Sequence, residues 1–196
     1  MAMKAELILA SASPRRQELL RQIGLSFSVY PSSFVENGDG SLSALDMAIR
    51  NAVGKARQVA KEHESGFVLG ADTVVVYQDQ VLGKPRDRAD ARRMLQLLSG
   101  RWHQVITAVA LVDAPSGRLM QDAISTRVHM RRLTPDEIED YLDSAEPYDK
   151  AGAYGIQGRA GQFVDRIEGC YFTVVGLPLS RVVEMIQAMH HEAKTR

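Results

Sequence analysis

The chain has 196 residues, of which 45% are hydrophobic and 24% charged, and this composition excludes a disordered or fibrous protein. Lys plus Arg and Asp plus Glu number 24 each, so no overall field draws the chain onto a nucleic-acid polymer. No apolar run approaches the roughly 20 residues that span a membrane, and the N-terminus lacks the pattern of a signal peptide. We expect one domain over residues 1–196, located in the cytoplasm, with neither membrane nor nucleic acid as partner.

The first informative stretch lies close to the N-terminus. Residues 7–9 (LIL) predict a short buried strand, and Pro14 predicts the first position of a helix, where its missing N–H costs nothing. Ser13 is then the expected N-cap. Because a helix N-terminus gathers free backbone N–H groups and the positive end of the helix dipole, this turn favours an anion.

Polar side chains around the turn strengthen the anion prediction. Arg15 and Arg16 fall in the first helical turn, where side chains lean back toward the N-terminus, and Ser11 adds a hydroxyl. Such a set is typical of a phosphate site. An ordinary helix cap followed by two solvated arginines explains the same residues, so this stretch alone leaves both interpretations open.

The segments that follow alternate between strand, loop and helix. We expect the first helix to bury Leu19, Leu20 and Ile23, and residues 27–29 to form a second strand. Residues 31–40 (PSSFVENGDG) predict a surface loop. Glu36 lies in that loop. It is either a ligand or a solvated surface charge, and the neighbouring residues do not distinguish between the two interpretations.

A long helix is predicted after Ser43, which is its expected N-cap. Its apolar residues recur at helical spacing: Leu45, Ala48, Ile49, Ala52, Ala56, Val59 and Ala60. Lys55 lies beside this stripe. A lysine there ordinarily extends along the edge of a buried face, so a ligand role for it needs further support.

Residues 67–77 (FVLGADTVVVY) form the second informative stretch. Their apolar, β-branched character predicts a strand buried on both faces, interrupted by Gly-Ala-Asp-Thr. Burying the Asp72 carboxylate there is unfavourable in free energy unless it is hydrogen-bonded, paired with a cation or bound to metal. It either accepts local backbone N–H bonds at a strand end or is a functional carboxylate at the mouth of a sheet, with Gly70 permitting close backbone approach.

The middle of the chain carries clear turn and cap signals. A hairpin is expected through residues 78–80, and Gly and Pro around Lys84 place that lysine on the lip of a turn. Asp87 is expected to cap a helix that buries apolar residues between 91 and 98. Residues 102–112 and 126–131 predict strands, and Thr134 begins a capping box.

Glycine recurs four times between residues 146 and 161, where the apolar periodicity stops. A long glycine-rich segment inside a compact domain is typical of a binding loop. Its Gln157 offers an amide donor and a carbonyl acceptor, which suits the edge of a nucleobase. Residues 163–167 and 171–175 then predict a hairpin, with Cys170 as a small apolar strand residue, and Pro178 begins a last helix.

Five motifs occur in order along the chain: Leu9–Arg16 (LASASPRR), Gly70–Thr73 (GADT), Gly83–Pro85 (GKP), Asp149–Gly158 (DKAGAYGIQG) and Val175–Pro178 (VGLP). Together they closely resemble the Maf family of nucleoside triphosphate pyrophosphatases. The resemblance spans nearly the whole chain. It implies a mixed α/β fold related to the inosine triphosphate pyrophosphatases, with an elongated, twisted sheet flanked by helices and a cleft between two lobes.

The resemblance also implies a reaction and the residues that perform it. A nucleoside triphosphate is hydrolysed to its monophosphate and pyrophosphate with Mg²⁺ or Mn²⁺, by a homodimer. Asp72 is implied as the proton acceptor, and Asp72 and Glu36 as the metal ligands. Four residues are implied to hold the phosphates: Ser11, Arg16, Lys55 and Lys84.

Three further positions indicate the substrate subgroup. Arg15, Thr73 and Gln157 resemble the family members that act on dTTP and UTP, whereas the subgroup for 7-methyl-GTP tends to have Trp, Gln and Glu there. A Gln amide can pair with the uracil or thymine edge, while a carboxylate accepts from guanine. A pyrophosphatase for a modified or purine nucleotide stays as an alternative. So does a nucleotide-binding regulator of cell division, since family members are also described as septum-formation inhibitors.

Overall fold

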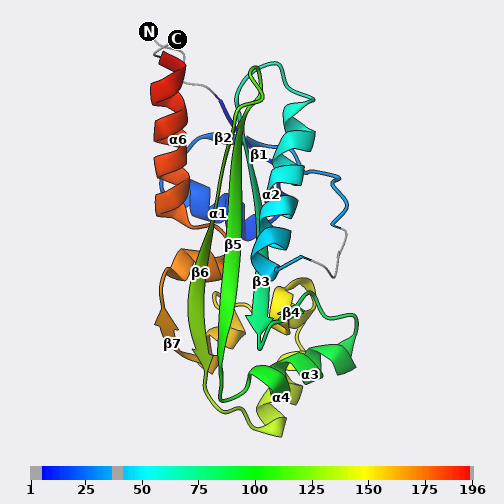
Figure 1. The fold of residues 1–196 in the computed structure, drawn as a ribbon. Helices are drawn as coiled ribbons and strands as arrows, with labels where there is room; N and C mark the ends of the chain where they lie inside the picture. Colours follow the sequence, from blue (N-terminus) through cyan, green and yellow to red (C-terminus); the bar gives the residue numbers. More distant parts are fainter. Residues whose placement is uncertain (1–5, 37–41, 195–196) are drawn as a thin grey trace. The chain divides into compact units, whose positions relative to one another are not determined.

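The computed structural model describes residues 6–36 and 42–194, with side chains up to residue 191. It is a mixed α/β structure of seven strands and six α-helices within these residues (Figure 1). The strands are β1 (Leu7–Leu9), β2 (Phe27–Val29), β3 (Phe67–Tyr77), β4 (Gln80–Leu82), β5 (Trp102–Asp113), β6 (Leu119–Met130) and β7 (Val164–Glu168). The helices are α1 (Pro14–Gln22), α2 (Ala44–Ala60), α3 (Arg88–Leu98), α4 (Pro135–Leu142), α5 (Tyr171–Val175) and α6 (Leu179–Lys194).

The strands form one mixed sheet in the order β2-β1-β3-β5-β6-β7, with β4 paired to β3. β1 runs parallel to both β2 and β3, so that Leu9 lies opposite Val29 on one side and Leu69 on the other. β4 is antiparallel to β3, and β7 to β6. The mixed α/β class expected from the sequence is confirmed.

The chain divides into two compact units. The first comprises the residues up to Asp72, residues Thr107–Ile124 and the chain from Gly176 onward. The second comprises Thr73–Ile106 and Ser125–Val175. Three strands, β3, β5 and β6, contribute residues to both units, so each unit has a share of the sheet.

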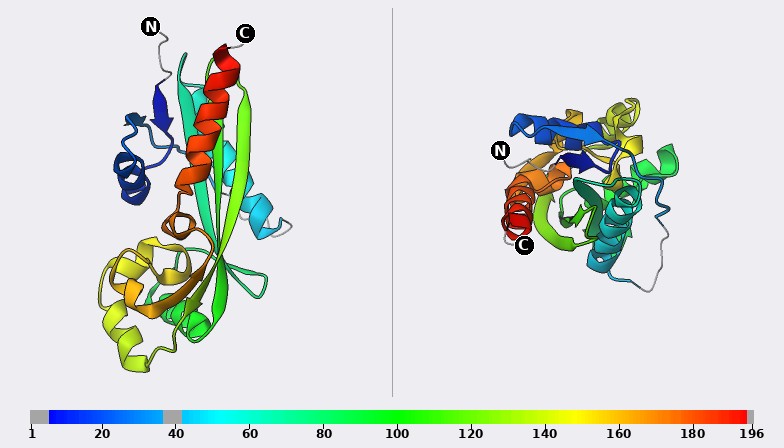
Figure 2. Two further views of the ribbon diagram at one scale, coloured as in Figure 1. Left: turned by 90° about the vertical axis from the view of Figure 1, so that its left-hand side faces the viewer. Right: turned by 90° about the horizontal axis from the view of Figure 1, so that it is seen from above.

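In the first unit, α2 and α6 lie on opposite faces of the strands (Figure 2). The apolar face of α2 is built largely of alanines, which allow close packing: Ala48, Ala52 and Ala56 are fully buried. Gly70 of β3 faces this helix, and a Cβ at Gly70 would overlap the Ala52 carbonyl oxygen and approach the Ala56 nitrogen to 2.8 Å. The glycine is therefore required for the contact between β3 and α2.

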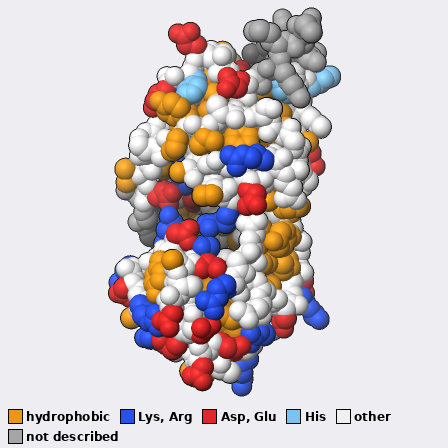
Figure 3. Space-filling model, turned by 180° about the vertical axis from the view of Figure 1, so that it is seen from behind, with side chains coloured by type: hydrophobic (Ala, Val, Ile, Leu, Met, Phe, Trp, Pro, Cys, Tyr) orange, Lys and Arg blue, Asp and Glu red, His pale blue; other side chains and the backbone are white. Residues whose placement is uncertain are grey.

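In the second unit, α3 and α4 close an apolar core with the ends of the long strands. Tyr141 and Phe163 meet edge to face with their ring centroids 5.2 Å apart, and both are almost completely buried. The segment 146–163 contains three short 3₁₀ turns, Glu146–Asp149, Ala151–Ala153 and Arg159–Phe163, and it packs on this core. On the face in Figure 3, basic and acidic side chains lie interspersed, in line with the zero net charge.

The predicted helix caps are confirmed. Ser13, Ser43 and Asp87 each accept a backbone N–H bond from the first turn of the following helix. Thr134 and Glu137 form the reciprocal capping box at the start of α4. The hairpin after β3 turns at Gln78 and Asp79, both with positive φ, as a tight two-residue turn requires.

Other details of the sequence prediction are wrong. Ile23 is 38% exposed because α1 ends before it, and Leu45, in the first turn of α2, is 43% exposed. Asp72 lies in the middle of the continuous strand β3 and not at a strand end. The motif from Gly70 to Thr73 does not interrupt that strand.

The second strand of the predicted C-terminal hairpin is instead the helix α5, and Cys170 precedes that helix. Gly169 has a φ of +125°, which turns the chain away from β7. The Thr126 hydroxyl then donates to the Cys170 carbonyl oxygen and accepts from the Cys170 N–H, at 3.0 Å each. Because a side chain satisfies this backbone, no strand ladder is needed there.

Candidate active site

The turn before α1 is held by a network of hydrogen bonds. The buried Ser11 hydroxyl oxygen accepts from the Ser13 N–H at 3.2 Å and from Arg16 Nη1 at 3.1 Å. The Ser13 hydroxyl accepts from the Arg16 N–H at 3.5 Å. With both of its lone pairs engaged, the Ser11 hydroxyl retains its own hydrogen to donate to an anion.

Arg16 is fixed in this turn by partners distant in the sequence. Its Nε donates to the Gly176 carbonyl oxygen at 2.9 Å, and its Nη1 is the donor to Ser11. Burial lowers the pKa of Arg16, while the carboxylates of Asp72 and Glu36 raise it. The neighbouring Arg15 lowers the pKa as well. The group remains a cation with fixed geometry, close to two carboxylates.

Asp72 is a buried carboxylate with a donor on each oxygen. Lys55 Nζ lies 2.7 Å from Oδ1, and Asn51 Nδ2 donates to Oδ2 at 3.0 Å. The same Lys55 Nζ also pairs with Glu36 Oε1 at 2.6 Å. One ammonium group thus joins the residue at the centre of β3 to Glu36, which lies in the chain between β2 and α2.

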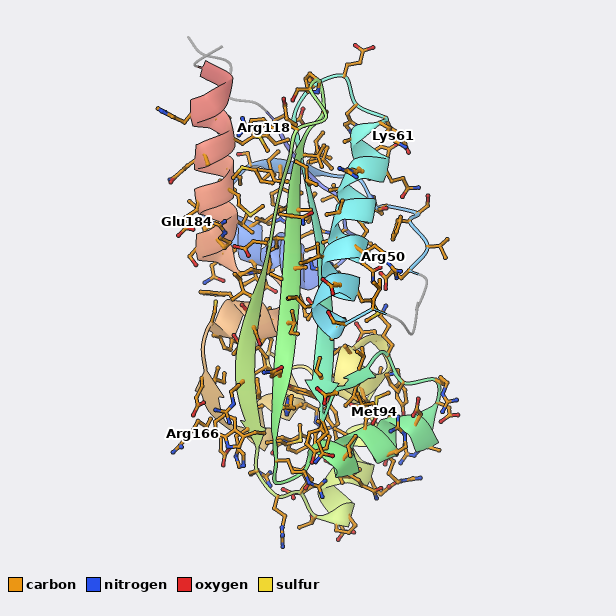
Figure 4. The ribbon with its side chains drawn as sticks, viewed as in Figure 1. Arg50, Lys61, Met94, Arg118, Arg166 and Glu184 are labelled. Carbon is orange, nitrogen blue, oxygen red and sulfur yellow. The ribbon has the colours of Figure 1, made fainter. Side chains whose placement is uncertain are left out.

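The geometry of α2 and β3 explains this convergence. Asn51 and Lys55 are four residues apart and share one helix face. Asp72 is two residues after Gly70 and projects from the same face of β3, toward α2. The close approach at Gly70 therefore brings the Asp72 carboxylate within reach of both side chains. Figure 4 labels Arg50 in α2 and Lys61 directly after its last residue, which helps to locate the helix.

Asn51 was not predicted as a site residue. Its side chain is 4% exposed, and its Oδ1 is a buried acceptor with no hydrogen-bond partner among the described residues. The sequence did contain one indication of its role, because Asn51 is a polar residue within the alanine-rich face of a predicted helix. Its partner Asp72 could be identified only from the three-dimensional structure.

The carboxylates fit a hard divalent cation by their chemistry. Glu36 and Asp72 each place an oxygen within 2.7 Å of one cationic nitrogen, so a single cation contacts both. Mg²⁺ is typically held by one or two carboxylates together with substrate phosphate oxygens. No group of three or more His, Cys, Asp or Glu side chains suited to a metal occurs in residues 6–36 and 42–191. A cation here would therefore need oxygens from the substrate.

Arg15 is half-buried in the first turn of α1, in the first unit. The other three predicted site residues belong to the second unit. Thr73 is half-buried and projects from the opposite face of β3 to Asp72, because side chains alternate along a strand. Lys84 and Gln157 are exposed. The Gly83 carbonyl oxygen accepts from the Gly152 N–H at 3.1 Å, so the turn before Lys84 is joined to the glycine-rich segment that carries Gln157.

Within the first unit, the structure thus brings together Asp72, Glu36, Lys55, Arg16 and Ser11, as described above. Two cations and a helix entrance can bind phosphate, and the buried carboxylate beside them can accept a proton from water. These features, on a mixed α/β sheet, fit the class of enzymes that act on phosphorylated substrates.

The comparisons with known proteins identify the family. The family model described as Maf-like protein matches residues 6–189. The chain therefore belongs to the Maf family of nucleotide hydrolases, and the resemblance seen in the five sequence motifs is confirmed.

Individual relatives are similar in sequence to this chain over almost their full length. A protein of Acetivibrio thermocellus named dTTP/UTP pyrophosphatase is 49% identical over 93% of this chain and 94% of its own. Relatives of the same name from Gloeobacter violaceus and Dictyoglomus thermophilum are 48% and 42% identical, over 94% and 95% of this chain and 96% and 97% of their own. No helix within the described residues is both long and apolar enough to cross a membrane.

Proposed function

We propose that this protein hydrolyses dTTP and UTP to their nucleoside monophosphates and pyrophosphate. The observation that carries the proposal is the buried Asp72 carboxylate, bonded to Lys55 and close to Arg16. The names of its relatives at 42–49% identity support the same two substrates. The homodimer expected from the family resemblance remains a prediction.

Asp72 is the proposed general base. It takes a proton from a water molecule whose oxygen forms a bond to the α-phosphorus. The bond from that phosphorus to the bridging oxygen breaks, and pyrophosphate leaves with the electron pair. For this step the Asp72 oxygen now bonded to Lys55 must become available, so Lys55 moves its interaction toward the substrate.

Four residues are proposed to bind the triphosphate. In the first unit these are Ser11 through its free O–H, Arg16 as a fixed fork and Lys55 as a movable ammonium group. Lys84 in the second unit is the fourth. Their positive charges neutralise the charge that accumulates on the departing pyrophosphate.

A divalent cation, Mg²⁺ or Mn²⁺, would be held by Asp72 and Glu36. When bound, such an ion stabilises negative charge on phosphate oxygens and makes a coordinated water more acidic. The Lys55 ammonium group contacts both carboxylates in this structure. A bound ion would take its place between them, and Lys55 would then be available to the phosphates.

Arg15, Thr73 and Gln157 are the proposed selectors of the base. Gln157 is exposed and can both donate and accept a hydrogen bond, as the imide and carbonyl edge of uracil or thymine requires. A carboxylate at this position only accepts.

Replacing Gln157 with Glu is expected to lower kcat/KM for dTTP and UTP by at least about tenfold, because one donor is lost and a charge faces the base carbonyls. The measurement is pyrophosphate release from dTTP, UTP and 7-methyl-GTP by the wild-type protein and by Gln157→Glu. Wild-type turnover of dTTP and UTP but not of 7-methyl-GTP is the expected result.

Two outcomes of this assay would count against the proposal. If the wild-type protein prefers 7-methyl-GTP, the proposed substrates are wrong. If the preference of Gln157→Glu matches that of the wild type, Gln157 does not read the base.

A further inference from the structure

A buried polar pair in the second unit has no part in the chemistry described above. Tyr154 belongs to the glycine-rich segment, and its hydroxyl lies 2.6 Å from Nε2 of His103 on β5. Their rings meet edge to face with centroids 5.4 Å apart. His103 is 3% exposed and Tyr154 6% exposed, so this bond is shielded from water.

The direction of the bond follows from the protonation of its two groups. Burial lowers the pKa of His103 to about 4, so the ring is neutral near pH 7. Burial raises the pKa of Tyr154, so its hydroxyl keeps its proton. The Tyr154 O–H therefore donates to Nε2, and His103 Nδ1 carries the ring hydrogen.

Burying this polar pair in the core costs free energy of desolvation. His103 Nδ1 is buried and has no well-formed hydrogen bond within the described part of the chain, although the Arg101 backbone interacts with the ring and raises its pKa. Two apolar side chains of similar size would avoid that desolvation cost. Packing alone therefore gives no reason for a histidine and a tyrosine at this place, and the specific bond between them needs another explanation.

Ala153, the residue before Tyr154, is held in a disfavoured conformation. Its φ is 61°, in a region that residues with a Cβ rarely adopt, whereas the preceding Gly152, with a φ of 71°, adopts this region without strain. The Gly152 N–H donates to the Gly83 carbonyl oxygen at 3.1 Å. Since local preference opposes this conformation, tertiary contacts such as the Tyr154 bond must maintain it.

A second anchor holds the other end of the same segment. One oxygen of the Glu146 carboxylate accepts from the Arg159 N–H at 2.9 Å, and the other from the Tyr141 hydroxyl at 2.9 Å. A Cβ at Gly158 would overlap this carboxylate, so the backbone passes directly over it. Gln157 thus lies three residues after Tyr154 and two before Arg159, between two fixed points.

We propose that His103 is a positioning residue for nucleobase selection. By accepting the Tyr154 hydroxyl bond, it fixes the backbone from Tyr154 to Gly158 and so the place at which the Gln157 amide meets a pyrimidine. The inference rests on the proposed function, in which Gln157 reads the base. His103 itself touches neither substrate nor reacting atoms.

The test is a double-mutant cycle with Tyr154→Phe and His103→Phe, scored by discrimination between UTP and CTP. These nucleotides differ at the pyrimidine edge, where an amino group replaces a carbonyl. Tyr154→Phe removes one hydroxyl and keeps the ring. We expect the ratio of kcat/KM for UTP to that for CTP to fall about fivefold, the worth of one hydrogen bond, mainly through KM for UTP. The double variant should match the single variants, because both remove the same bond.

Tyr148→Phe is the matched control. It also removes a half-buried hydroxyl from this unit, one that donates to the Leu142 carbonyl oxygen at 2.8 Å, and it should leave the UTP/CTP ratio unchanged. A loss of folded protein lowers turnover of both nucleotides equally and cannot move the ratio.

Three outcomes would overturn the inference: an unchanged ratio in Tyr154→Phe, an equal fall in Tyr148→Phe, or additive effects in the double variant. A wild-type protein that hydrolyses neither UTP nor dTTP would instead refute the proposed function, so the two failures are distinguishable.

Discussion

Replacement of Asp72 by Asn is expected to lower kcat by at least about two orders of magnitude, because the amide cannot take the proton from water. Asn has nearly the size of Asp, and its oxygen can still accept from Lys55 or Asn51. The fold should therefore survive. Steady-state pyrophosphate release measures kcat, and thermal unfolding monitored by circular dichroism checks that the variant is folded.

Asp165→Asn is the control for this change. Asp165 is a carboxylate of the second unit whose Oδ1 pairs with His129 Nδ1 at 2.6 Å, and it has no assigned role in the reaction. Its kcat should equal that of the wild type. Near-normal turnover by a folded Asp72→Asn variant would show that Asp72 is not the general base.

The second large effect is expected at Gly70. A Cβ there would overlap the Ala52 carbonyl oxygen and lie 2.8 Å from the Ala56 nitrogen. Both are backbone atoms of α2, which cannot move aside as a flexible side chain can. Gly70→Ala should therefore lower the free energy of unfolding by about 3 kcal/mol, as overpacking of a tight core does. Urea denaturation measures this difference.

Gly83→Ala serves as the comparison, since a Cβ at Gly83 has no atom within 4 Å. Its free energy of unfolding should lie within about 0.5 kcal/mol of the wild-type value. Equal stabilities for Gly70→Ala and Gly83→Ala would contradict the tight contact between β3 and α2.

Local features of the fold could be predicted because their causes are local. A serine or aspartate before a helix satisfies free N–H groups within three residues, so the caps at Ser13, Ser43 and Asp87 follow from sequence alone. The buried strand β3 was likewise indicated by its own β-branched residues.

The features that were missed depend on distant parts of the chain. Residues 171–175 have strand-like composition, yet Thr126 satisfies the Cys170 backbone and Gly169 redirects the chain into a helix. At residues 171–175, these tertiary contacts outweigh the intrinsic preference for a strand, which is worth at most about 1 kcal/mol.

In the candidate site, too, some features could be predicted from the sequence and others required the structure. Asp72 could be singled out because a charge in an apolar strand demands a partner, but the sequence did not reveal which partner. The structure supplies Lys55 and Asn51 from one face of α2. Glu36 had no distinctive surroundings in the sequence, and its 2.6 Å ion pair with Lys55 is what the structure adds to connect it to Asp72.

The central claim is that water attacks the α-phosphorus and pyrophosphate departs. Hydrolysis of dTTP in heavy-oxygen-labelled water, with the products resolved by phosphorus NMR and mass spectrometry, tests it most directly. The predicted result is dTMP that carries the label and pyrophosphate that does not. Label in the pyrophosphate, or dTDP and inorganic phosphate as products, would contradict it.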